Sequence, residues 1–398
     1  MNAPFKSSAI KRLIPELGLK EYWYPVLSAG KVRNKPVGMK ILGEDLVFFR
    51  GKDGQVVAAS NTCPHRGGSL MHGDCHYRGT VACPYHGWVF DEHGECVAVL
   101  SEGPESSMPG KATLRIYPTR TLKNFVFVWM GEGEPSPIEE DVPPEFFEGK
   151  DTVLFISVRQ WPVNWRIALE NSLDSHVMYV HRDALLQLME PIQQFGRVGY
   201  YPKVVNGRTC IGYLKDPPRV GREFFPGVGD YWPKTEWRKL WLWAFRWRVA
   251  KEFRPFHEDS EEWGMHAKVN GKYVRAAGHH LPSMFRFDFG GQMYTRFCVP
   301  VAADLTRIVY VHAARKRSWL GKTLLAVYFH LFRNWAMNIN FSSQDHRVMA
   351  TQNYDAPEIL SSSDAELVRW RRMLLRARGM PGESNMPPVD ATNNPVNL

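Results

Sequence analysis

Features that would send a chain of 398 residues out of the cell or through a membrane are missing. The N-terminal MNAPFKSSAIKRLIPELG is basic but has no apolar core and no small-residue cleavage site, so it does not resemble a secretory signal. The apolar stretch 319–332 is interrupted by Lys322 and His330 and is shorter than the roughly 20 residues of a spanning helix. We expect a cytoplasmic protein, and keep as an alternative a peripheral membrane contact of 319–332, which follows the basic run 315–317.

Cysteine is scarce, and several cofactor and nucleic-acid motifs are absent. Six cysteines are too few for a disulfide framework in a chain of this length, which fits a reducing compartment. The net charge is +9, but the basic residues are scattered and no nucleic-acid module is present, so we expect an acidic protein partner or a lipid surface instead. Without a dinucleotide fingerprint, flavin motif or plant-type ferredoxin spacing, the chain cannot draw electrons from NAD(P)H by itself.

The sequence pattern predicts two domains and a tail. Residues 22–130 contain short alternating apolar and polar runs separated by Gly, Asp and Asn turns, which predicts a small antiparallel β domain. A segment rich in Pro, Gly and acidic residues follows, and beyond it a helical pattern at 165–181, strand-like runs over 199–299 and a well-signalled helix after Ser363 indicate an α+β domain. We place the domains at 1–135 and 136–380, with a disordered tail at 381–398.

The strongest motif is CPHRGGSLMHGDCHYRGTVACPYHGW. Cys63-x-His65 and, seventeen residues later, Cys83-x-x-His86 supply one sulfur and one nitrogen from each of two loops. A Rieske [2Fe–2S] centre needs this division, because two Cys hold one iron and two His hold the other. The motif therefore predicts such a cluster, with nearby glycines allowing close approach of the backbone.

Two other metal chemistries use related residues. A structural zinc site also takes two Cys and two His, but zinc fingers pair like with like along the chain, whereas each loop here mixes the two types. Electron-transfer Rieske proteins of respiratory complexes usually carry an additional Cys in each loop, and these two loops have none. The pattern favours the oxygenase type of Rieske site over both.

A second constellation follows in NWRIALENSLDSHVMYVH, which offers Asn171, Asp174, His176 and His181, with a distant carboxylate at Asp345. Non-heme Fe(II) oxygenases hold their metal with two His and one carboxylate on one face, leaving positions open for O2 and substrate. Two His and an Asp on a helix are weak evidence taken alone, since buried polar clusters are common. The upstream cluster motif strengthens the interpretation.

Across nearly its full length the chain resembles Rieske non-heme iron oxygenase α subunits, especially those without a β subunit, such as the components that act on carbazole and on ketosteroids. The CPHRG and CPYHGW loops, NWRIALEN, the later YVH, HHLP and the late Asp345 occur in family order. The resemblance implies an N-terminal all-β Rieske domain and a C-terminal helix-grip (START-like) catalytic domain with an antiparallel sheet and C-terminal helices. It also implies a set of ligands: Cys63 and Cys83 on one cluster iron, His65 and His86 on the other, and His176, His181 and Asp345 on a mononuclear iron.

The segment between Asp174 and His181 departs from the family pattern. The resemblance makes Asp174 the carboxylate that links a cluster His to an iron-ligand His of the neighbouring subunit, and Asn171 a neighbour of the iron. The family usually has Asp-x-x-His, whereas Asp174-Ser175-His176 is one residue shorter. Residues i and i+2 of an α-helix lie about 200° apart, so we hypothesise a π-bulge or kink that turns the ligands to one side.

The resemblance implies a terminal oxygenase that takes electrons from a separate ferredoxin or NAD(P)H-dependent reductase and acts with O2 on a hydrophobic, ring-containing substrate. It further implies a homotrimer in which the cluster of one subunit serves the iron of the next. A polycyclic aromatic or a steroid- or terpenoid-like substrate is preferred. Monohydroxylation, demethylation, desaturation and cis-dihydroxylation all use these ligands and stay open. The alternative function is a Rieske electron carrier without oxygen chemistry.

Overall fold

The computed structural model describes residues 11–173, 180–181, 184–185, 200–205, 208–213, 267–269, 272–274, 278–289, 292–354, 356–360 and 364–380. The chain divides into two compact units. The β unit comprises residues 20–138 with 299–303, and the α+β unit comprises 1–19, 139–298 and 304–398. The domain boundaries placed from composition stay a prediction.

The β unit is built from three small antiparallel sheets. Their strand orders are β1 (Trp23–Ser28)-β10 (Phe125–Trp129)-β9 (Thr119–Leu122), β2 (Val37–Ile41)-β3 (Glu44–Arg50)-β4 (Val56–Ser60)-β8 (Ile116–Tyr117), and β5 (Thr80–Ala82)-β6 (Trp88–Asp91)-β7 (Cys96–Val99). Short 3₁₀ turns lie at η1 (Ala29–Lys31) and η2 (Leu70–His72). The predicted antiparallel β architecture of this region is confirmed.

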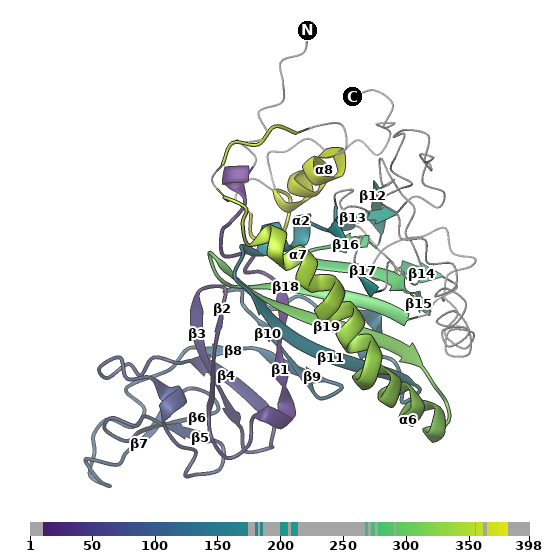
Figure 1. Ribbon diagram of the computed structural model, residues 1–398. Helices are drawn as coiled ribbons and strands as arrows, with labels where there is room; N and C mark the ends of the chain where they lie inside the picture. Colours follow the sequence, from purple (N-terminus) through teal and green to yellow (C-terminus); the bar gives the residue numbers. More distant parts are fainter. Residues whose placement is uncertain are drawn as a thin grey trace, which may run out of the picture. The chain divides into compact units, whose positions relative to one another are not determined.

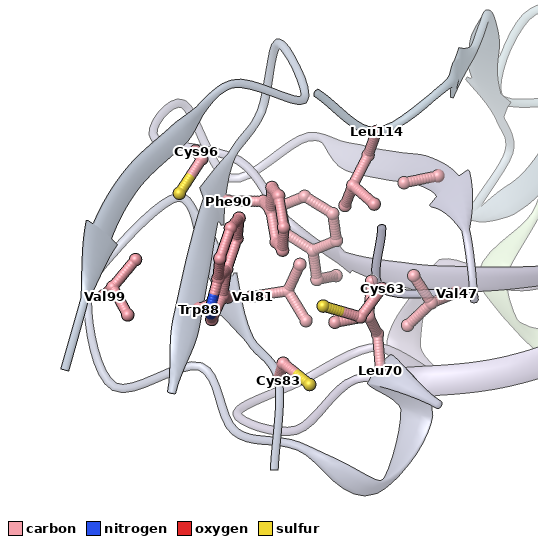
Figure 2. Close-up of a cluster of buried hydrophobic side chains, with 12 residues drawn as sticks. Val47, Cys63, Leu70, Val81, Cys83, Trp88, Phe90, Cys96, Val99 and Leu114 are labelled. Carbon is pink, nitrogen blue, oxygen red and sulfur yellow. The ribbon is translucent and has the colours of Figure 1, made fainter. Parts of the chain in front are cut away.

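Hairpin turns explain the compactness of the β unit. Leu42 and Gly43 between β2 and β3 have φ angles of 50° and 79°, and Lys123 and Asn124 between β9 and β10 have 45° and 64°. Two successive positive φ angles are the mark of the turn whose twist matches that of paired strands. Strands β3 to β7 contribute to a buried cluster of aliphatic and aromatic side chains that also contains Cys63 and Cys83 (Figure 2).

A seven-stranded sheet forms the centre of the α+β unit. Its order is β11 (Thr152–Trp161)-β19 (Leu305–Arg315)-β18 (Gln292–Ala302)-β17 (Met284–Phe289)-β16 (Gly278–His280)-β13 (Arg208–Tyr213)-β12 (Tyr200–Val205). The strands β14 (Ala267–Val269) and β15 (Lys272–Val274) pair separately. Single 3₁₀ turns occur at η3 (Ile138–Glu140) and η4 (Pro144–Phe146).

One long helical segment lies across this sheet (Figure 1). It runs through α6 (Trp319–Tyr328), the π-helix η7 (Phe329–Phe341) and α7 (Ser342–Met349). Ser318 caps its start by accepting a hydrogen bond from the Gly321 N–H. The Phe329 ring stacks on Phe155 of β11 at 4.5 Å, which fixes the helix over the sheet.

Two shorter helices of the α+β unit are α2 (Trp165–Glu170) and α8 (Ala365–Leu374). Asn164 caps α2 by accepting from the Arg166 N–H. Arg371 of α8 donates to both carboxylate oxygens of Glu170 at 2.8 Å, so α8 holds the end of α2 in place. An antiparallel sheet with these helices confirms the predicted α+β class.

The apolar stretch 319–332 is helical: its first ten residues form α6 and the others begin the π-helix, which the sequence analysis did not predict. Among the described residues no helix is both long and apolar enough to cross a membrane. The buried residues of the π-helix mix apolar and polar types and have no single spacing: Phe329, Arg333, Ala336, Met337 and Asn338. The sequence pattern therefore gave no clear signal for it.

Candidate functional site

Two loops of the β unit present the cysteines of the predicted cluster site with the same backbone pattern. The Cys63 N–H donates to Gly68 O and the Gly67 N–H to Cys63 O, at 2.8 and 2.9 Å. The Cys83 N–H donates to Trp88 O and the Gly87 N–H to Cys83 O, at 2.8 and 3.1 Å. Gly67 and Gly87 have φ angles of 72° and 66°, which only glycine adopts without strain. Each loop is therefore folded by local hydrogen bonds around its own Cys.

Sulfur and nitrogen donors lie in different environments. The thiols of Cys63 and Cys83 are buried and adjacent, while His65 is exposed and His86 half-buried. Burial, and next the neighbouring Cys83 thiol, raise the pKa of Cys63 to about 11. The His65 and His86 rings lie 4.7 Å apart, and Trp88 stacks on His65 at 4.8 Å.

This donor set fits a Rieske [2Fe–2S] cluster. Two buried sulfurs and two outward imidazoles match the division between the two irons of such a centre. A Cβ on Gly68 would lie 3.1 Å from Cys83 Sγ, so only glycine leaves the sulfur its full space. With its raised pKa, the Cys63 thiol would need neighbouring positive charge, such as iron, to bind as a thiolate.

A second pair of predicted ligands meets in the α+β unit. His181 Nε2 lies 2.8 Å from Asp345 Oδ1, and the two side chains are 0% and 4% exposed. Asp345 is in the first turn of α7, and His181 comes from the segment that follows α2. Two ligands at about 2.1 Å from one metal ion and at right angles to each other are about 3 Å apart, so this spacing suits a shared ion.

Hydrogen bonding sets the direction of the His181 ring. Its Nδ1 lies 3.2 Å from Gln344 Oε1, and an amide oxygen can only accept, so Nδ1 carries the proton. That leaves Nε2 as the nitrogen that faces Asp345 Oδ1, where it presents a lone pair when only Nδ1 is protonated. Two lone pairs 2.8 Å apart repel unless a proton or a cation lies between them. Phe341, stacked on the ring at 3.6 Å, keeps water from one face.

Other predicted iron-site residues are not all described. His176 and Asp174 lie outside the described residues, and so does the segment of the hypothesised π-bulge. Asn171 is the C-cap of α2, where the chain leaves toward His181, and its role stays a prediction. Within the described part of the chain, no three His, Cys, Asp or Glu side chains gather as a complete single-ion site.

Around this pair lies a buried polar sheet face that sequence reasoning missed. Tyr294 and Arg296 of β18 and Tyr310 of β19 are buried, and burial raises the pKa of both phenols. Gln292, on the same face of β18, is 1% exposed, and among the residues that the structure describes neither its amide oxygen nor its amide nitrogen has a hydrogen-bond partner. Strand alternation predicts which residues share a face, but not that this face carries polar groups near Asp345.

A further link pins the end of α2. Ser172 Oγ lies 2.8 Å from His279 Nε2 and also donates to Leu169 O at 2.6 Å. Burial holds the pKa of His279 well below its ordinary value, so the ring stays neutral. The single hydroxyl proton of Ser172 goes to Leu169 O, so the Nε2–H of His279 donates to Ser172 Oγ. The HHLP motif of the sequence thus anchors the start of the segment that carries His181.

Two family models match the chain. Residues 22–118 match the Rieske [2Fe-2S] domain, and residues 129–209 match the homotrimeric ring hydroxylase family.

Curated relatives are similar over part of their length. The terminal oxygenase component of carbazole 1,9a-dioxygenase from Sphingomonas sp is 34% identical over 174 residues, 43% of this chain and 45% of the relative. The oxygenase subunit of phthalate 4,5-dioxygenase from Pseudomonas putida is 36% identical over 160 residues, 39% of this chain and 36% of the relative. The chain thus matches less than half of the length of each.

Solved structures are similar over the whole fold. The terminal oxygenase of carbazole 1,9a-dioxygenase from Nocardioides aromaticivorans has a TM-score of 0.68 at 23% identity, covering 92% of this chain and 96% of that one. A carbazole-bound oxygenase and ferredoxin complex of carbazole 1,9a-dioxygenase has a TM-score of 0.68 at 22% identity, covering 95% and 96%. At this identity the likeness supports the fold.

Proposed function

We propose that this chain is the terminal oxygenase component of a multicomponent Rieske non-heme iron oxygenase system. In this proposal it uses O2 to hydroxylate a hydrophobic, ring-containing substrate. The relatives named above act on aromatic compounds, as their names state, which supports an aromatic substrate class. A polycyclic aromatic or a steroid- or terpenoid-like molecule is our preferred substrate.

The buried pair of His181 and Asp345 carries the proposal. A Rieske electron carrier needs only the two cluster loops of the β unit. Electron transfer alone does not require the imidazole of His181 and the carboxylate of Asp345 to lie 2.8 Å apart inside the α+β unit. A buried His–Asp pair with no ion would be a costly arrangement, because both groups lose hydration. The pair therefore favours the oxygenase over the electron carrier.

Each residue has a defined task in this proposal. Cys63, Cys83, His65 and His86 would hold the cluster, and His176, His181 and Asp345 the mononuclear iron. When bound, the cluster supplies single electrons, and the ferrous ion supplies the place where O2 is reduced. Gln344 holds the His181 tautomer, and Phe341 covers one face of its ring.

The buried sheet face suggests how the substrate is held. Ring-shaped ligands need a largely apolar pocket with a few placed polar groups. Tyr294 contributes ring surface on this face, and the amide of Gln292, which has no partner within the described ranges, could hydrogen-bond a polar atom of the substrate. Water excluded by such a lining would limit wasteful release of reduced oxygen.

We propose a homotrimer and a separate electron donor as partners. The matching family model is that of a homotrimeric ring hydroxylase, and the similar solved structures include complexes of an oxygenase with a ferredoxin. Asp174 would link the cluster of one subunit to the iron of the next. A net charge of +9 suits an acidic ferredoxin.

We also propose a peripheral contact between the helical segment 319–335 and an anionic membrane surface. Residues 315–344 contain no Asp or Glu, and exposed large apolar side chains follow the helix: Trp319, Leu320, Leu324, Val327, Leu331 and Trp335. Sedimentation with phosphatidylglycerol vesicles, but not with phosphatidylcholine vesicles, and its loss in Leu324→Glu would support the contact. If Leu324→Glu instead dissociated the proposed trimer, these exposed apolar side chains would be assigned to a contact between subunits.

The oxygenase proposal is tested by a metal count on the anaerobically purified protein. We expect a brown protein with about three irons and two sulfides per chain, and a reduced EPR signal typical of a mixed His/Cys cluster. Asp345→Asn should lose one iron and all oxygenation but keep the cluster signal. Asp304→Asn, an exposed carboxylate in the turn between β18 and β19, is the matched control and should keep three irons.

Each other outcome has a definite meaning. Two irons in the wild-type protein would favour the electron carrier. A colourless protein with zinc would overturn the whole proposal. Three irons in Asp345→Asn would remove that residue from the ligand set.

A further inference from the structure

Arg296 of β18 contacts α7, which carries the predicted ligand Asp345, and α2, from whose end the chain runs to His181. Its Nη2 donates to the carbonyl oxygen of Ala168 in α2 at 3.1 Å. Its Nη1 lies 3.9 Å from Asp345 Oδ2 in α7. The residue is 4% exposed, so one guanidinium in the interior contacts two separate helices.

The guanidinium is clamped as well as buried. It lies over the Trp161 ring and over the Phe285 ring, 5.5 Å from each centroid. Cation–π contacts on two rings leave the planar group little rotational freedom. Its hydrogen-bonding directions are therefore fixed by the sheet, not by the helices that it contacts.

The two oxygens of Asp345 face different partners. Oδ1 is 2.8 Å from His181 Nε2, whereas Oδ2 is the oxygen nearer the arginine. At 3.9 Å the contact with Arg296 is too long for a hydrogen bond, so it acts through charge. In a water-free interior this attraction still orients a carboxylate, and it turns Oδ1 toward His181.

We propose that Arg296 is a positioning residue for the mononuclear iron site. It holds the Asp345 carboxylate in a ligand-ready orientation and ties α2, from which the chain runs to His181, to the same strand. The inference rests on the proposed function, because it takes His181 and Asp345 as iron ligands.

Fe(II) affinity tests the proposal directly. The mononuclear site is emptied with a chelator while the cluster is kept, and Fe(II) is returned by equilibrium dialysis. Arg296→Met and Arg296→Lys should both bind Fe(II) about 10- to 100-fold more weakly than the wild type. Loss of a residue that orients a metal ligand usually lowers metal affinity by this factor. Lysine keeps the charge but cannot reach Ala168 O and Asp345 together, so it should not rescue binding.

Arg286 supplies the matched control. It is fully buried in the neighbouring strand β17 and pairs with Glu145 at 2.6 Å. Arg286 is opposite Thr295, and Phe285 opposite Arg296, so the two arginines project from opposite faces of the sheet. Arg286→Lys removes a comparable buried contact and should leave Fe(II) affinity within about twofold of the wild type.

The outcomes separate this inference from the proposed function. Wild-type Fe(II) affinity in both Arg296 variants would overturn the positioning role. Full rescue by Arg296→Lys would also overturn it, because a positive charge without the fixed link to Ala168 O would then be sufficient. If Arg296→Met does not fold, Arg296→Lys decides. Undiminished Fe(II) binding by Asp345→Asn would instead overturn the ligand assignment, whatever the arginine variants do.

Discussion

His312, on the sheet beneath the π-helix, should make the α+β unit sensitive to acid. The ring is fully buried, with Nε2 3.2 Å from Asn338 Oδ1 and Nδ1 accepting from Arg333 Nε at 3.4 Å. Both nitrogens are therefore used by the neutral ring. Burial, and next the positive charge of Arg333, lower the pKa of His312 to about 3 from an ordinary 6.5.

The magnitude follows from that displacement of the pKa. Between pH 6.5 and 3 the unfolded chain binds a proton that the folded chain refuses, so stability is complete above pH 6.5 and falls as the pH drops. Each pH unit costs about 1.4 kcal/mol, so about 2 to 3 kcal/mol should be lost between pH 6.5 and 4.5. That is a large part of the 5–15 kcal/mol that typically stabilises a folded domain.

Urea unfolding at several pH values, followed by tryptophan fluorescence, measures this effect. His312→Gln can keep a donor toward Asn338 and an acceptor for Arg333 but does not titrate. The wild type should lose about 2 to 3 kcal/mol more than this variant between pH 6.5 and 4.5. His330→Gln, an exposed position on the same helical segment, is the control and should follow the wild type. Equal pH slopes for wild type and His312→Gln would refute the reasoning.

Two further predictions concern the cluster loops and a buried ion pair. Gly68→Ala places a Cβ 3.1 Å from Cys83 Sγ and should lower the iron and sulfide content. Gly67→Ala meets open space, so it should leave the iron and sulfide content unchanged and cost only about 1–2 kcal/mol of backbone strain. Equal iron and sulfide content in the two variants would contradict this prediction. Glu145→Gln removes the carboxylate that Arg286 contacts at 2.6 Å and should lower the free energy of unfolding by about 3 kcal/mol, measured by urea titration. A loss of a few tenths of a kcal/mol would show that the pair contributes little.

The cluster loops could be predicted from the sequence because everything that shapes them is local. Cys63, Gly67 and Gly68 lie within six residues and are joined by their own backbone hydrogen bonds, and the loop of Cys83 repeats that pattern. The spacing of these residues in the sequence therefore determines most of the loop geometry. The alternation of short strands around turns likewise determined the β architecture of 22–130.

Only the tertiary structure decided which side chains surround the second site. His181 and Asp345 are far apart in the sequence, and their contact depends on the long helix lying across the sheet. Gln344 could have been noticed because it is next to the predicted ligand Asp345 in the sequence. Arg296 has no such local signal, because a strand pattern shows which face of the sheet a residue is on but not which distant side chain it contacts. Residue type and spacing thus determined the chemistry that the chain can perform. Long-range packing decided how the proposed iron ligands are oriented, because burial and fixed distances exist only once distant segments are folded together.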